Sequence, residues 1–87
     1  MAYAIEILPS AQRELKKLNP TERRRIAAAI QKLGENPRPD GVKKLKSPDP
    51  LYRIRIGSRR VIYWIEDRKL KVLVIQIALR KDAYRRL

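Results

Sequence analysis

Four arginines are placed in this sequence so that they could gather on one surface. Arg53 and Arg55 lie in the alternating segment 51–56, where residues two apart point to the same side of a β-strand. Arg60 begins the next such segment, and Arg80 follows the last one. If these strands are neighbours, four guanidinium groups converge on one face of a sheet. Guanidinium groups clamp phosphate by two-point contacts, so such a face would bind a phosphate-bearing ligand.

The alternative to phosphate binding is a solvated polar face without a ligand. Alternation alone places any single arginine on the solvent-exposed side of a sheet. A solvated surface usually mixes charges of both signs. Between Gly41 and Tyr63, however, Asp49 is the only acidic residue. We therefore predict anion binding.

Three lysines and one tyrosine extend this pattern. Lys44 and Lys46 lie two apart on the preceding segment, and Lys81 follows Arg80 directly. We expect all three lysines to contact the same anionic ligand as the arginines, which is the phosphate backbone of RNA if the partner is a nucleic acid. Tyr84 stands in an otherwise charged stretch. Its ring either anchors a terminal helix or stacks on an RNA base, and the sequence favours neither.

The composition excludes several kinds of chemistry. The chain has no cysteine and no histidine, so it lacks disulfides, thiolate nucleophiles, and both the commonest general base and the commonest metal ligand. Its carboxylates are scattered without the spacing of a metal site or an acid–base pair. The sequence therefore predicts no metal and no cofactor. The 87 residues fit one domain, 1–87.

The net charge of +13, from 22 basic and 9 acidic residues, indicates an anionic partner. Nucleic acid and an acidic protein are both compatible with it. No apolar run approaches the roughly 18–20 residues of a membrane span. The N-terminus also lacks the pattern of a secretory signal, so we expect a cytoplasmic protein without a membrane partner.

The spacing of apolar residues along the chain predicts the helices and strands that must position these side chains. A short strand over 3–8 precedes two helices, the first with Ser10 as N-cap and the second with Asn19 as N-cap, and Gly34 and Asn36–Pro37 end the second. Strands are then expected over 42–46, 51–56, 60–65 and 70–79, with a short helix over 80–87. The strand over 70–79 is dense in apolar residues, so we expect it to be central and covered on both faces. The order β-α-α-β-β-β-β-α predicts an α+β domain with a helical hairpin on one face of an antiparallel sheet.

The order and spacing of several short motifs make the chain similar to the RelE toxins of the RelE/ParE superfamily, over nearly its whole length. These motifs are Met1–Tyr3, Leu15–Leu18, Asn36–Arg38, Lys44–Leu45 before Pro48–Asp49, Tyr52–Ile56, Arg60–Tyr63 and Arg80–Tyr84. The resemblance implies a metal-independent mRNA interferase that works in the ribosomal A site, where a ribose 2′-hydroxyl attacks the next phosphate. It also implies an acidic, RelB-like antitoxin that inhibits the toxin.

The resemblance assigns roles to five residues. Arg53 and Arg55 match the basic positions that hold the phosphate and help to activate the nucleophile. Arg60 matches the residue that stabilises the transition-state charge, Arg80 a proposed general acid, and Tyr84 a tyrosine that stacks on or orients a base.

One departure concerns the general base. The best-studied RelE toxins have lysines at the positions of Arg53 and Arg55, and a crowded lysine can lose its proton. An arginine stays charged and is a poor base. Lys44, Lys46, Tyr84 and a ribosomal group all remain candidates.

Two further functions remain open. ParE-type toxins have the same fold and poison DNA gyrase, although they typically lack the set formed by Arg60, Arg80 and Tyr84. A non-catalytic RNA-binding module would also explain the charge, but not the placement of Tyr84 close to Arg80.

Overall fold

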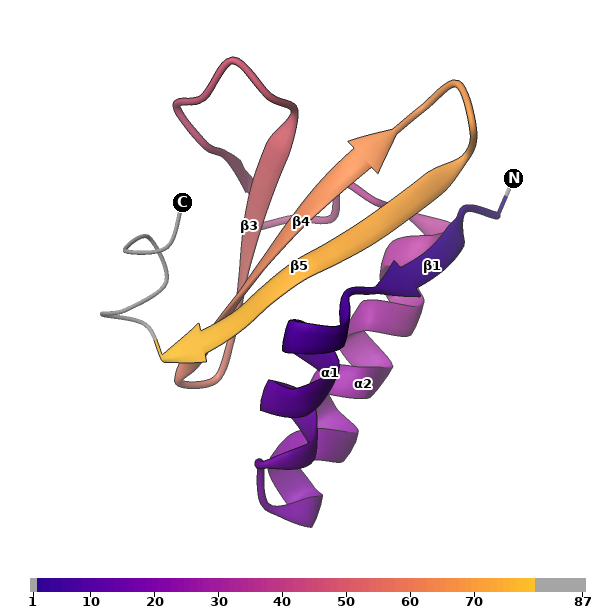
Figure 1. Ribbon diagram of the computed structural model, residues 1–87. Coiled ribbons are helices and arrows are strands. Elements are labelled where there is room, and N and C mark those ends of the chain that lie inside the picture. Colours follow the sequence, from indigo (N-terminus) through magenta and orange to yellow (C-terminus); the bar gives the residue numbers. More distant parts are fainter. Residues whose placement is uncertain (1, 80–87) are drawn as a thin grey trace.

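The computed structural model describes residues 2–79. Within them the chain runs through a short strand, two helices and four further strands (Figure 1). In chain order these are β1 (Ala4–Ile7), α1 (Pro9–Lys16), α2 (Pro20–Glu35), β2 (Lys43–Lys44), β3 (Leu51–Ile56), β4 (Arg59–Glu66) and β5 (Lys71–Leu79). The predicted order is confirmed as far as β5, and the helix expected over 80–87 lies outside the described residues.

The two helices begin in different ways. Asn19 caps α2 as predicted, because its side-chain oxygen accepts a hydrogen bond of 2.8 Å from the backbone N–H of Glu22. The prediction of Ser10 as the N-cap of α1 was wrong. Leu8 occupies that position without a side-chain hydrogen bond, and Pro9 is the first helical residue. The fixed φ of proline suits the first helical position, so it starts the helix without a polar cap.

Gly34 lies within α2 and does not end the helix as predicted. It allows the backbone at Tyr3 to come close to the helix. The helix continues to Glu35, and Asn36 is the C-cap. The backbone N–H of Tyr3 donates to the Gly34 carbonyl at 2.6 Å. A Cβ on Gly34 would stand 3.0 Å from the Tyr3 carbonyl oxygen. Glycine therefore lets the start of the chain pack against the last turn of α2.

The strands form one mixed sheet in the order β1-β5-β4-β3-β2. All neighbours are antiparallel except β1 and β5, which are parallel, and Glu6 and Lys71 form an ion pair across them. The prediction of a wholly antiparallel sheet is therefore corrected at β1. Parallel strands need a long crossover, which the helices and strands between β1 and β5 supply. As its apolar run predicted, β5 lies inside the sheet, next to β1 in Figure 1.

The main core lies between the sheet and the two helices. Apolar stripes of both helices pack there against alternate residues of β3, β4 and β5. The fully buried members of this core include Ala11, Ile26, Ile30, Leu33, Val61, Tyr63, Val72, Val74 and Ile77.

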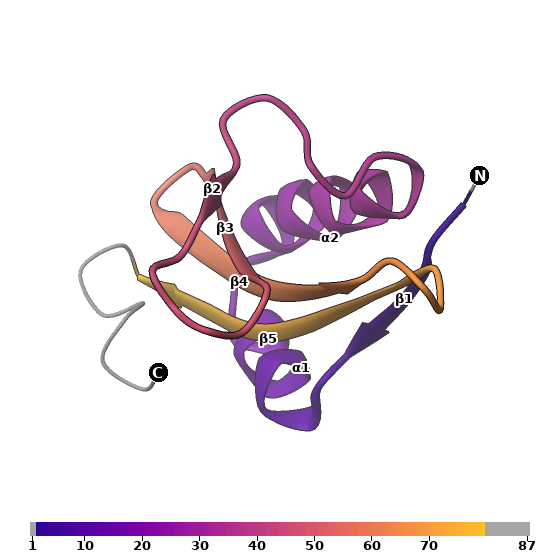
Figure 2. The same cartoon turned by 90° about the horizontal axis from the view of Figure 1, so that it is seen from above.

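The connection from α2 to β3 runs along the β2 side of the sheet (Figure 2). Neither of the helices in the described part of the chain is long and apolar enough to cross a membrane.

Candidate functional site

Three of the predicted arginines share one face of the sheet. Arg55 of β3 is paired directly with Arg60 of β4, and Arg53 is paired with Ile62. Paired residues of antiparallel strands point to the same side, so Arg53, Arg55 and Arg60 lie together. The intervening Ile54 packs against the main core, to which both helices contribute, so this arginine face is the one turned away from the helices. The grouping predicted for these three residues is confirmed. Arg80, Lys81 and Tyr84 lie outside the described residues.

The three arginines differ in exposure. Arg55 is exposed, Arg60 is half-buried, and Arg53 is buried with 8% of its surface accessible. Arg55 and Arg60 place two guanidinium groups beside each other on this face. A phosphate bound there would accept charge-assisted hydrogen bonds from them. The arrangement suits the binding of a phosphodiester.

Gln76 belongs to the same face, although sequence reasoning missed it. It is paired with Ile62, so Arg53, Ile62 and Gln76 form one row across β3, β4 and β5. Gln76 is 9% exposed, and Ile62 is fully buried between the two polar residues. The available signal was weak: apart from Lys71, Gln76 is the one polar side chain in the run 70–79.

The lysines of the β2 edge are placed differently from the prediction. Lys43 is paired with Arg53, whereas Lys44 is paired with Tyr52. Lys44 therefore points to the helix side of the sheet, and Lys43 occupies the place on the arginine face that was predicted for Lys44. The spacing of Lys44 and Lys46 showed only that they share a side, because the side itself depends on the register with β3. Lys46 is exposed in the loop after β2.

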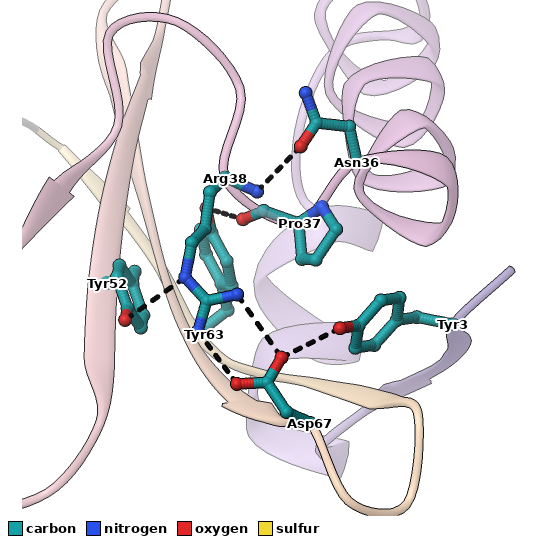
Figure 3. A network of polar contacts seen from close by, with 7 residues as sticks. All are labelled: Tyr3, Asn36, Pro37, Arg38, Tyr52, Tyr63 and Asp67. Carbon is teal, nitrogen blue, oxygen red and sulfur yellow. Dashed lines mark hydrogen bonds and ion pairs between the residues drawn. The ribbon is translucent and has the colours of Figure 1, made fainter. Parts of the chain in front are cut away.

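A polar network at the other end of β3 connects three distant segments (Figure 3). Arg38 makes a two-point contact with Asp67, with distances of 3.2 Å from Nη1 to Oδ1 and 3.0 Å from Nη2 to Oδ2. The Tyr3 hydroxyl also donates to Asp67, at 2.7 Å. The hydrogen bond from Arg38 lowers the pKa of Asp67, and the bond to Asp67 raises the pKa of Tyr3. The network ties the N-terminus and the α2–β2 connection to the β4–β5 turn.

The same network reaches the strand that carries the arginines. The Arg38 guanidinium lies 5.1 Å from the centre of the Tyr52 ring, and its Nε donates to the Tyr52 hydroxyl at 3.3 Å. Tyr52 stacks on Tyr63, whose hydroxyl donates to the Pro37 carbonyl at 2.7 Å (Figure 3). Burial raises the pKa of Tyr63. Because Tyr52 immediately precedes Arg53, these contacts hold the start of β3 in place.

The opposite end of the arginine face is held by an ion pair. Arg59 begins β4, and its Nη2 lies 3.2 Å from Oε1 of Glu22 in α2. Gly57 forms the preceding turn with a φ of +62°, a conformation that glycine adopts without strain. The β3–β4 hairpin that carries Arg55 and Arg60 is thus attached to the helical layer.

The fold and the site define a small basic α+β protein with an arginine-lined sheet face suited to phosphate. The chain belongs to the family described as the ParE toxin of the type II toxin–antitoxin system parDE, whose model matches residues 5–84. It is therefore a toxin of a type II toxin–antitoxin system.

Sequence similarity to two RelE proteins supports this assignment. The chain is 32% identical over 88 residues to a protein of Methanocaldococcus jannaschii named RelE1, with 98% of each chain covered. It is 31% identical over 83 residues to the mRNA interferase toxin RelE of Escherichia coli, covering 93% of this chain and 86% of the relative.

Solved structures show the same architecture. The toxin in the RelE–RelB complex of Pyrococcus horikoshii matches with a TM-score of 0.83 and 28% identity, over 92% of this chain and 97% of that one. A free mutant of E. coli RelE matches with a TM-score of 0.78 and 31% identity, over 98% and 90%. The resemblance to RelE-type toxins is confirmed, and so is the α+β fold class that the order of elements predicted.

Proposed function

We propose that this toxin is an endoribonuclease that cuts mRNA in the ribosomal A site without a metal ion. The observation that carries this proposal is the cluster of Arg53, Arg55 and Arg60 on one sheet face. The name of the E. coli relative, an mRNA interferase, supports it. In the proposed reaction the ribose 2′-oxygen bonds to the adjacent phosphorus, and the bond from phosphorus to the 5′-oxygen breaks. A base takes the 2′-proton, and an acid supplies a proton to the leaving 5′-oxygen.

The positions of the three arginines give each of them a separate role in the proposed reaction. Arg53 and Arg55 hold the phosphate, because they project from alternate positions of one rigid strand. Arg60 faces Arg55 across the ladder and stabilises the charge that builds up on the pentavalent phosphate. Arg80 as general acid and Tyr84 as stacking partner remain predictions from the resemblance. Lys43 joins Lys46 and Lys81 as a proposed phosphate contact in place of Lys44.

Ribosome dependence and metal independence follow from what these residues supply. Permanently charged arginines clamp phosphate but do not remove a proton efficiently. The base is then Tyr84, a lysine or a ribosomal group, and a message held by the ribosome is already placed for attack. Metal independence is part of the proposal because the chain has no histidine or cysteine and its carboxylates lack the spacing of a metal site.

We further propose an acidic, RelB-like antitoxin and a cytoplasmic site of action. The related toxin of P. horikoshii was solved in a complex with RelB. A net charge of +13 favours an acidic partner, which electrostatic attraction would bring in rapidly.

A gyrase poison is the second candidate, because the matching family is described by the name ParE. A passive RNA-binding module is the third. One set of assays separates them: translating ribosomes, free RNA and DNA gyrase are each incubated with the purified toxin. The proposal expects new mRNA ends with a 2′,3′-cyclic phosphate and a 5′-hydroxyl, only in the presence of ribosomes. Gyrase inhibition with intact mRNA would overturn it, and so would binding of mRNA without cleavage.

A further inference from the structure

Arg53 and Gln76 stand out within residues 2–79 as the buried polar side chains, with 8% and 9% of their surfaces exposed. Arg53 Nε and Gln76 Oε1 are closed off from water, and neither has a hydrogen-bond partner in this part of the chain. Buried polar atoms in folded proteins are nearly always paired, so each unpaired one calls for an explanation. Here a donor and an acceptor are both left unpaired on the same face.

The two side chains flank a single apolar position. Both are paired with Ile62 in register, Arg53 from β3 and Gln76 from β5. Adjacent strands lie about 4.8 Å apart, which puts the two backbones roughly 10 Å from each other. The Arg53 and Gln76 side chains therefore lie on either side of Ile62 on one face of the sheet. Ile62 offers no polar atom to either of them, so a ligand that reaches this row could engage Arg53 and Gln76 together.

The chemistry of the two groups describes that ligand. The guanidinium only donates hydrogen bonds, whereas a carboxamide accepts through its oxygen and donates through its nitrogen. The ligand must therefore present an acceptor to Arg53 and, close by, a hydrogen-bonding group to the amide. A phosphodiester supplies the acceptor. In RNA the neighbouring group is the ribose 2′-hydroxyl or the polar edge of a base.

We propose that Gln76 is a binding residue for the RNA nucleotide whose phosphate Arg53 holds, and that its amide hydrogen-bonds the ribose 2′-hydroxyl or the base edge of that nucleotide. This inference rests on the proposed RNA-cleaving function. A glutamine kept for stability would have its carbonyl paired. An unpaired buried carbonyl instead destabilises the free protein, as is usual for groups that are kept for binding.

The test compares Gln76→Met, which keeps the size and removes the amide, with Gln76→Asn, which keeps the amide. Gln31→Met on the exposed surface of α2 is the matched control. Each variant is assayed for thermal unfolding and for cleavage of a message library on ribosomes. Gln76→Met should unfold at the same or a higher temperature than wild type and cleave about tenfold more slowly or worse. Gln76→Asn should retain more activity, and Gln31→Met all of it.

The pattern of cut sites identifies the group that Gln76 binds. A loss confined to particular nucleotides indicates the base edge, and an equal loss at all sites indicates the 2′-hydroxyl. Wild-type cleavage rates for Gln76→Met would overturn the proposal. A loss of activity that comes with a lower unfolding temperature would also overturn it, because it would assign Gln76 a structural role.

Binding of a short single-stranded RNA to the purified chain separates this proposal from the cleavage reaction. If wild type binds the RNA more tightly than Gln76→Met but cuts no message, the cleavage proposal fails and the role of Gln76 stands. If both proteins bind it equally and wild type cuts no message, both proposals fail.

Discussion

Replacing Tyr63 by phenylalanine tests how the start of β3 is held. The Tyr63 side chain is fully buried, and its hydroxyl donates a hydrogen bond of 2.7 Å to the carbonyl of Pro37, which is itself buried. Tyr63→Phe keeps the ring and its stacking on Tyr52 but leaves that carbonyl without a donor. An unsatisfied buried polar group costs about 1–3 kcal/mol. A loss of about 2 kcal/mol lowers the Tm of a domain of this size by roughly 8–16 °C.

Thermal and urea unfolding followed by circular dichroism would measure this loss. Tyr3→Phe is the matched control, because its hydroxyl bonds to Asp67 at an exposed position where water can replace it. The control should stay within about 0.5 kcal/mol of wild type. If Tyr63→Phe were as stable as wild type, or if the two variants lost equal stability, the buried bond to Pro37 would not hold this segment as we argue.

Three further predictions concern the site and the network. Arg60→Ala should lower the rate of mRNA cleavage by about 10²–10³-fold and leave ribosome affinity nearly unchanged, because its contribution lies in the transition state; equal losses in rate and affinity would point to a general electrostatic anchor. Tyr84→Phe should keep most of the cleavage activity and Tyr84→Ala should lose most of it if stacking is the main role, whereas a phenylalanine variant as inactive as alanine would assign proton transfer to the hydroxyl. Because the hydrogen bond from Arg38 lowers the pKa of Asp67 in the folded state, this pair stabilises the fold above the unfolded pKa of the carboxyl and loses its effect as pH falls through the lowered folded value. Asp67→Asn should therefore flatten the acid side of a plot of stability against pH, and an unchanged acid limb would disprove the role of this carboxylate.

Short-range patterns in the sequence were enough to predict the type and order of the helices and strands within residues 2–79. Alternation in β3 placed Arg53 and Arg55 on one side and Ile54 on the other, because successive side chains of a strand always point to opposite faces. Asn19 was identified as a cap because its side chain bonds a backbone group only three residues away. The apolar run of β5 predicted a strand inside the sheet, and the strand order confirms this place. Its coverage is less even than predicted, because Val72, Val74 and Ile77 are buried whereas Leu73 and Ile75 are half-buried.

The pairing of distant segments was decided only by the tertiary structure. That Arg55 faces Arg60, that Lys43 rather than Lys44 joins the arginine face, and that β1 adds to β5 in parallel all depend on register or strand order. A slip of one residue in register moves every side chain of a strand to the other face, and no short-range pattern specifies the register of an exposed edge strand such as β2.

The contacts missed by sequence reasoning have the same origin. Arg38 meets Asp67 across 29 positions of the chain, and Gln76 lies in one row with Arg53 only through the strand between them. The sequence by itself thus determined the order of the elements within residues 2–79 and the basic character of the arginine face. The particular residues that meet there were decided by the tertiary structure, because contacts between distant segments depend on how the whole chain packs.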